Sequence, residues 1–200
     1  MNYKHLLTFI VLIFFTLAAK AQNLNTAKGA SYLTAEEQKL IYLMNVARND
    51  GNRFIRDYLD KHVKDNNLQG NSYVKSLYRK LRKTKGLTPF LPSKSLSKAA
   101  EFHANDMGKT GKIGHSSSDG TSPNTRVRKY FTGYTWGENC SYGYKDAIGI
   151  IMQLLIDDGV PSLGHRKNIF KKGFKYVGVS IRPHKKYRYN CVMDFADTGK

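Results

Sequence analysis

The spacing of apolar residues changes along this chain, and that change limits the folds open to it. From Thr34 to Gly159 the apolar side chains recur mainly every three or four residues, which is the period of an amphipathic helix. After Lys175 they alternate in two runs, Tyr176–Arg182 and Tyr187–Phe195, around the turn sequence "PHKK". Helices followed by a terminal hairpin predict an α+β domain with helices packed on a small antiparallel sheet.

Local signals predict where individual elements begin and end. The first helix opens with a capping box, in which Glu37 follows Thr34 by three residues. In "KDAIGIIMQLLIDDG", Asp146 favours the start of a strong helix, and Gly159 with Pro161 ends it. We expect a loop over 111–133, a short strand over 136–142 and one more helical turn in "GHRKNIF".

Residues 1–21 predict a secretory signal peptide. A short basic start precedes the apolar run "LLTFIVLIFFTLAA", and "AKA" fits a small-x-small cleavage site before Gln22. A membrane anchor is the alternative, but the run is shorter than the roughly 20 apolar residues that a span needs. We expect a secreted protein, extracellular or periplasmic, in which residues 22–33 form a lead-in and no later segment crosses a membrane.

The chain is strongly basic. Its formal net charge is +18, and removal of residues 1–21, which hold Lys4 and Lys20 but no acid, leaves +16. No Asp or Glu occurs within 66–100 or within 159–193. We interpret this charge first as a solvated surface that keeps the protein soluble, and the alternative is attraction to anionic surfaces such as cell-envelope material. No nucleic-acid-binding motif accompanies the charge, so specific nucleic-acid binding is not expected.

A few polar residues stand in glycine-rich or helix-ending positions. They are His115 in "GHSSSDG", Glu138 in "WGEN", His165 in "LGHRKN", and the adjacent Asp157 and Asp158. Two imidazoles and two carboxylates suit a divalent metal such as zinc, copper or nickel, and they also suit acid–base chemistry without metal. The chain has no HExxH motif and no pair of histidines one helical turn apart, so a purely structural role is the alternative.

Two further histidines receive structural interpretations. His103 shares an apolar helical face with Leu96, Ala100 and Met107, so we interpret it as a hydrogen-bonded core residue and not as a ligand. His184 falls in the hairpin turn, where we expect it to be exposed.

Four segments, in this order, resemble the CAP superfamily of cysteine-rich secretory proteins, insect venom antigen 5 and plant pathogenesis-related proteins. They are "LSKAAEFHANDMGKTGKIGHSSSDGTSPNTRV", "WGENCSYGYKDAIGIIMQLLIDD", "GHRKNIFKKGFKYVGVSI" and "YNCVMDFA". The wording "HSSSDGTSP", "GEN" and "GHRKNI" is most similar to the bacterial secreted branch, whose domain is also called SCP. The likeness runs from Glu36 to Phe195.

The resemblance implies an α-β-α sandwich over residues 34–197, with a shallow cavity that holds two histidines and two acids. Asp158 aligns with the second family acid, where animal members have Glu, and Asp157 is its rival. Three residues match the family site directly: His115, Glu138 and His165.

The resemblance also suggests why Glu138 stands in such a specific frame. We expect Trp136 to pack beneath a turn, Gly137 to allow a close crossing and Asn139 to tie the turn with hydrogen bonds. Glu138 would then face the cavity and hold one histidine in a defined tautomer. It is also the candidate general base if the site is catalytic.

This chain departs from the family pattern in three places. Residues 52–85 look like an insertion, and their two amphipathic patterns predict two helices on the rim of the core. Leu155 stands where many members have Trp. Cys140 and Cys191 are the only cysteines, and the family's small sheet would bring their strands together, so we expect a disulfide; two buried free thiols are the alternative.

Four functions remain open at this stage. The first is a secreted binding domain that takes Zn²⁺ or another divalent cation through His115 and His165. The second is a metal-dependent hydrolase of peptide or envelope material, with Glu138 as base, although no Ser or Cys nucleophile is framed. The third is a lipid- or sterol-binding module, as in some eukaryotic members. The fourth is adhesion to anionic envelope material through the basic surface.

Overall fold

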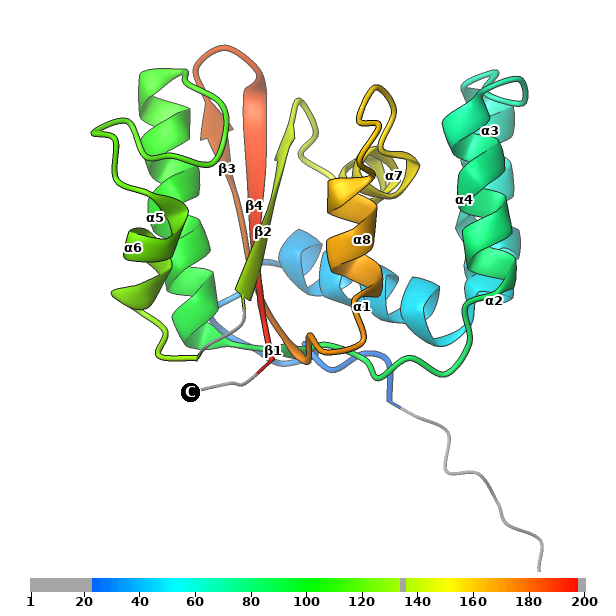
Figure 1. The fold of residues 1–200 in the computed structure, drawn as a ribbon, viewed down its shortest axis with the longest axis horizontal. Coiled ribbons are helices and arrows are strands. Elements are labelled where there is room, and N and C mark those ends of the chain that lie inside the picture. The colour runs from blue at the N-terminus through cyan, green and yellow to red at the C-terminus, as the bar shows by residue number, and fades with distance from the viewer. Residues whose placement is uncertain (1–22, 134–135, 198–200) are drawn as a thin grey trace, which may run out of the picture.

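The computed structural model describes residues 23–133 and 136–197 of the chain (Figure 1). The N-terminal half is helical, with one π-helical turn, η1, between two α-helices. The elements are α1 (Ala35–Asn49), α2 (Gly51–Phe54), η1 (Ile55–Leu59), α3 (Asp60–Asp65), α4 (Ser72–Arg82), β1 (Leu91–Pro92), α5 (Lys94–Thr110), α6 (Pro123–Arg128), β2 (Trp136–Tyr142), α7 (Ala147–Ile156), α8 (Gly164–Phe170), β3 (Tyr176–His184) and β4 (Arg188–Ala196).

Within the described residues, four strands form one sheet in the order β1-β3-β4-β2. The hairpin β3–β4 is antiparallel, as its alternating pattern predicts, and β2 pairs antiparallel with β4. The short β1 pairs parallel with the start of β3, which makes the sheet mixed.

Helices cover both faces of the sheet, which confirms the predicted α+β sandwich (Figure 1). The helices α5 and α6 lie on one face, and α1, α7 and α8 lie on the other. Gly178 of β3 permits the close approach of α5, because a Cβ there would lie 2.1 Å from the backbone carbonyl carbon of Leu96. The larger apolar core lies between the sheet and α1, α7 and α8, and smaller clusters lie beneath α5.

The predicted helix starts are confirmed where a capping residue marks them. Thr34 and Glu37 form the reciprocal capping box of α1, and Asp146 accepts a hydrogen bond from Gly149 N at the start of α7. One helix lies where the sequence predicts a loop. It is α6, which begins with Pro123 and is capped by Ser122, a common start for a short helix.

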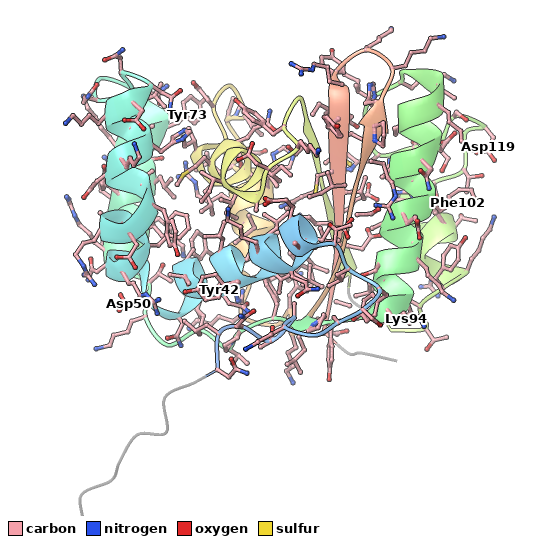
Figure 2. The ribbon with its side chains drawn as sticks, turned by 180° about the vertical axis from the view of Figure 1, so that it is seen from behind. Tyr42, Asp50, Tyr73, Lys94, Phe102 and Asp119 are labelled. Carbon is pink, nitrogen blue, oxygen red and sulfur yellow. The ribbon has the colours of Figure 1, made fainter. Side chains whose placement is uncertain are left out.

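Residues 51–82 form a helical layer beyond α7. Asp50 ends α1 and caps α2 by accepting a hydrogen bond from Arg53 N at 2.9 Å (Figure 2). Gly51 allows this tight join, since a Cβ there would lie 2.1 Å from the carbonyl oxygen of Leu81 in α4. The layer is anchored by buried apolar side chains, which include Phe54, Leu59, Leu77 and Leu81.

The predicted disulfide is wrong, and the sheet register gives the reason. Cys140 is paired with Val192, whereas Cys191 is paired with Ser141. Because successive side chains in a strand point to opposite faces, the two sulfurs lie on opposite sides of the sheet. Both cysteines are buried free thiols.

The expectation that His184 is exposed is also wrong. Its side chain is buried, and its ring organises the hairpin turn. Nε2 donates to the carbonyl oxygen of Lys112 at 2.9 Å, and Nδ1 accepts from the backbone N–H groups of Lys186 and Tyr187, each at 3.2 Å. His184 therefore stabilises the turn through hydrogen bonds to three backbone groups.

The predicted signal peptide lies outside the described residues, as does the side chain of Trp136. Among the helices that are described, none combines the length and the apolar character needed to span a bilayer.

Candidate functional site

The first predicted site histidine, His115, follows α5 and pairs with Glu138 of β2. His115 Nδ1 lies 2.8 Å from Glu138 Oε1. Because an ionised carboxylate only accepts hydrogen bonds, Nδ1 is the protonated nitrogen of this imidazole. Hydrogen bonding to Glu138 raises the pKa of His115 above its ordinary value, and burial opposes part of that rise. The expected role of Glu138 in fixing a tautomer thus has a defined geometry.

Arg126, from α6, holds the other oxygen of Glu138. Its guanidinium is fully buried, and Nη2 donates to Glu138 Oε2. Nη1 donates to the carbonyl oxygen of His115 at 2.9 Å and to Ser117 Oγ at 3.1 Å. Burial alone would raise the pKa of Glu138, but the bond from His115 and the charge of Arg126 outweigh it and hold that pKa below its ordinary value. Glu138 is therefore an ionised, fully engaged carboxylate.

The second predicted histidine, His165, lies at the start of α8 and pairs with Asp157. His165 Nδ1 is 2.7 Å from Asp157 Oδ1, which fixes the same tautomer as in His115. Asp157 ends α7 in the left-handed backbone conformation, with φ of 59°, and its Oδ2 accepts from Arg166 N at 3.1 Å. Asp158 is exposed and instead accepts from Asn71 Nδ2 at 2.8 Å. The acid that contacts His165 is thus the rival, Asp157, and not Asp158.

Asn139 connects the strand of Glu138 to the helix of His165. Its Nδ2 donates to the carbonyl oxygen of His165 at 3.0 Å, and its Oδ1 accepts from Asn168 Nδ2 at 2.9 Å. Gly137 lies against α8 and the loop that follows it, because a Cβ there would be 3.0 Å from the ring of Phe174. The frame around Glu138 therefore ties edge strand β2 to α8.

A buried polar cluster surrounds Glu138 on the α5 face of the sheet. His103 of α5 is fully buried, and its Nε2 donates to the carbonyl oxygen of Gly114 at 2.9 Å, as expected for a hydrogen-bonded core residue. Burial lowers the pKa of His103. The Cys140 thiol is 3.7 Å from both His115 Nδ1 and Glu138 Oε1. Burial, with Glu138 nearby, raises the pKa of Cys140 well above its ordinary value, so the free thiol is protonated.

Asp194 is a further acid in this cluster that the sequence analysis did not identify. It is the direct cross-strand partner of Glu138 in β4 and is fully buried. Neither of its oxygens accepts a hydrogen bond from any described residue. Burial and the negative charge of Glu138 raise the pKa of Asp194 well above its ordinary value, which favours its protonated form. In the sequence, an acid within the otherwise apolar run "CVMDFA" could have pointed to Asp194. No sequence feature pointed to Arg126.

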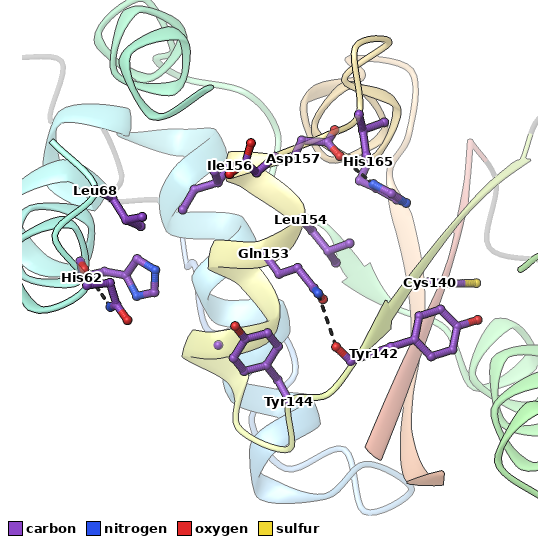
Figure 3. Close-up of a pocket in the computed structure, with 14 residues that line it drawn as sticks. His62, Leu68, Cys140, Tyr142, Tyr144, Gln153, Leu154, Ile156, Asp157 and His165 are labelled. Atoms are coloured by element: carbon purple, nitrogen blue, oxygen red, sulfur yellow. Dashed lines mark hydrogen bonds and ion pairs between the residues drawn. The ribbon is translucent and has the colours of Figure 1, made fainter. Parts of the chain in front are cut away.

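A pocket of about 490 Å³ opens between α3, β2, α7 and α8 (Figure 3). His165 and Asp157 lie on one side of it, and Tyr142 and Cys140 come from β2. Asp158 also contributes to its lining, whereas His115 and Glu138 do not. The opposite wall includes His62, so the helical layer 51–82 completes the pocket.

The comparisons with known proteins agree with this architecture. The profile of the Cysteine-rich secretory protein family (CAP) matches residues 75–195, more than half of the chain. A search among curated proteins found no match.

Solved structures of bacterial proteins resemble part of the fold. An extracellular protein containing a SCP domain from Bacillus anthracis has 18% identity and a TM-score of 0.46, over 62% of this chain and 38% of that protein. An outer surface protein from Borrelia burgdorferi has 20% identity and a TM-score of 0.47, over 62% and 87%. A cysteine-rich secretory protein from Staphylococcus aureus has 19% identity and a TM-score of 0.44, over 63% and 38%. The match thus spans less than half of two of these proteins.

The segment order, the α-β-α sandwich and the profile match lead to the same assignment: the chain belongs to the cysteine-rich secretory protein (CAP) family.

Proposed function

We propose that this chain is an exported CAP domain that binds a divalent cation such as Zn²⁺ through Nε2 of His115 and Nε2 of His165. The observation that carries the proposal is that each Nδ1 is bonded to a carboxylate, at 2.8 Å for Glu138 and 2.7 Å for Asp157. This leaves the lone pair of each imidazole on Nε2. A carboxylate behind the ligand histidine, which fixes its tautomer and raises its basicity, is the usual arrangement in zinc proteins.

The exposure of the two rings supports this role. The side chain of His115 is 52% exposed and that of His165 is 26% exposed, while their carboxylate partners are 2% and 0% exposed. The acids are therefore turned inward and serve as orienting groups, and the imidazole edges face outward. Two protein ligands leave coordination positions for water or for a ligand group, so we expect modest affinity.

The geometry of Glu138 does not support the hydrolase hypothesis. A general base needs a free lone pair directed at the water that it activates. Both oxygens of Glu138 already accept hydrogen bonds, one from His115 and the other from Arg126. Binding without turnover is the function that the site supports best.

Export and the domain boundaries complete the proposal. The basic start and apolar run of residues 1–21 support secretion, and residues 34–197 would form the CAP domain. We regard residues 52–85 as an insertion that adds the wall containing His62 to the pocket. An anionic envelope component is the partner that the net charge of +16, which remains after residues 1–21 are removed, favours.

Histidine NMR tests the central part of this proposal. Long-range ¹H–¹⁵N spectra of the metal-free protein should show Nδ1-protonated tautomers for His115 and His165. Zn²⁺ should then shift both Nε2 signals and leave His62 unchanged. Because Glu138 raises the pKa of His115, protons should displace the metal at a higher pH than they would for a free imidazole. Nε2-protonated tautomers, or Zn²⁺ shifts confined to His62, would overturn the proposal.

A further inference from the structure

The buried cluster behind His115 contains a second set of metal-ligating atoms. One ring nitrogen of His103, one carboxylate oxygen of Glu138 and the Cys140 sulfur all lie within 4.8 Å of one another. All three residues are buried, and they come from α5 and β2. The set is separate from the exposed Nε2 edges of His115 and His165.

The hydrogen bonding of His103 points to a ligand. Its Nε2 must be protonated, because it donates to the carbonyl oxygen of Gly114 at 2.9 Å. The lone pair therefore lies on Nδ1, which has no hydrogen-bond partner among the described residues. Fully buried acceptors without a partner are rare in folded proteins and call for an explanation. A metal ion accepts such a lone pair directly.

Asp194 is a further buried acid beside this cluster. It faces Glu138 across the β2–β4 ladder, on the side of the sheet that carries the cluster. Both of its oxygens are buried and without a hydrogen-bond donor among the described residues. One helix and one strand thus bring a sulfur, an imidazole and a carboxylate together in one interior region, and Asp194 lies next to it across the β2–β4 ladder.

The donor atoms select the class of ion. A thiolate and an imidazole favour zinc and disfavour the hard cations Mg²⁺ and Ca²⁺, which take oxygen ligands. Arg126 contacts Glu138 through Oε2. The other oxygen, Oε1, is the one nearest Cys140, at 3.7 Å. A metal on Oε1 would therefore compete with His115 and leave the contact with Arg126 intact.

We propose that His103, Glu138 and Cys140 form a buried zinc site. On binding, the S–H bond of Cys140 breaks, its proton passes to solvent and a sulfur–zinc bond forms. Cys140 is also among the residues that line the pocket, but its side chain points from β2 toward the α5 side of the sheet (Figure 3). Three buried protein ligands leave the fourth tetrahedral position of the ion to water, whereas the exposed pair of histidines leaves two positions open.

Cobalt spectroscopy of the full reduced chain tests the site, because only a thiolate ligand gives a sulfur-to-cobalt charge-transfer band in the near ultraviolet. The wild type should develop this band with a stoichiometry of one per chain. Cys140→Ser should abolish it. Cys191→Ser is the matched control, since Cys191 is also buried but lies on the opposite face of the sheet, and it should retain the band. A wild type without the band, or a Cys191→Ser variant that loses it, overturns the proposal.

Two measurements keep this test independent of folding and of the function proposed above. In the wild type, Zn²⁺ should slow alkylation of Cys140 at least tenfold and should leave Cys191 unchanged, as read by mass spectrometry of peptides. Equal rates with and without Zn²⁺ would contradict the site. A His115→Ala, His165→Ala variant lacks the exposed histidines and should keep the cobalt band. If this double variant keeps the cobalt band but the exposed histidines of the wild type do not bind Zn²⁺, the function proposed above is wrong and the buried site still stands.

Discussion

Replacing Glu138 by Gln tests whether its charge holds the site together. The side chain of Glu138 is 2% exposed, and the guanidinium that it pairs with, Arg126, is fully buried. The amide keeps the shape but removes the charge, so Arg126 loses its counter-ion in the interior. Breaking a buried ion pair in this way costs about 3–5 kcal/mol. Protonated Asp194 lies directly opposite and can ionise to replace part of the charge, so we expect about 3 kcal/mol, the lower end of that range.

The assay is urea unfolding at neutral pH, followed by far-ultraviolet circular dichroism, on the metal-free protein. Asp65→Asn is the matched control, because Asp65 pairs with Lys61 at 2.7 Å while their side chains are 49% and 80% exposed. That exposed pair should contribute less than about 1 kcal/mol. Equal losses of unfolding free energy in the two variants would refute the argument that burial makes the Glu138–Arg126 ion pair more stabilising than an exposed one.

A double-mutant cycle isolates the contribution of Asp194. In an Asp194→Asn background no second acid can ionise, so Glu138→Gln should cost about 1 kcal/mol more than in the wild type. Equal costs in the two backgrounds would show that Asp194 does not replace the missing charge.

The single variant Asp194→Asn should lose little stability at low pH. As pH rises, its stability should increase relative to that of the wild type. Because the pKa of Asp194 is raised in the folded state, the wild type loses stability as pH rises from the unfolded-state pKa of this group towards its folded-state pKa. Measuring the free energy of unfolding at about pH 5 and about pH 8 checks this. Asp157→Asn should disturb the NMR signals of His165, whereas Asp158→Asn should leave them unchanged. Mass spectrometry of the unreduced protein should find Cys140 and Cys191 as free thiols that alkylate quickly only after denaturation.

Much of the fold followed from periodicity and end signals. Thr34 with Glu37 and Asp146 each mark a helix start locally, and alternation alone identifies the β3–β4 hairpin. These features depend on neighbouring residues, so a single sequence contains them. The helix α6 was missed because its short stretch has little apolar periodicity and is defined mainly by Ser122 and Pro123.

The predictions about the site that were wrong depend on strand register and on backbone conformation. The disulfide prediction placed the correct strands side by side, but a shift of one residue in pairing decides which face each sulfur occupies. The choice between Asp157 and Asp158 turns on the left-handed conformation at the end of α7, with φ of 59° at Asp157. Arg126 and Asp194 reach Glu138 only through tertiary packing, so no local pattern connects them.

Zinc calorimetry at about pH 7.5, above the ordinary pKa of a free imidazole, tests the central claim most directly. The titrations use a Cys140→Ser background, so that the buried cluster lacks its thiolate and the exposed histidines are measured alone. That protein should bind one Zn²⁺ with modest affinity, and adding either His115→Ala or His165→Ala should abolish the heat of binding. Adding His62→Ala, which alters the far wall of the pocket, should leave it unchanged. Equal heats before and after removal of His115 and His165 would contradict the account.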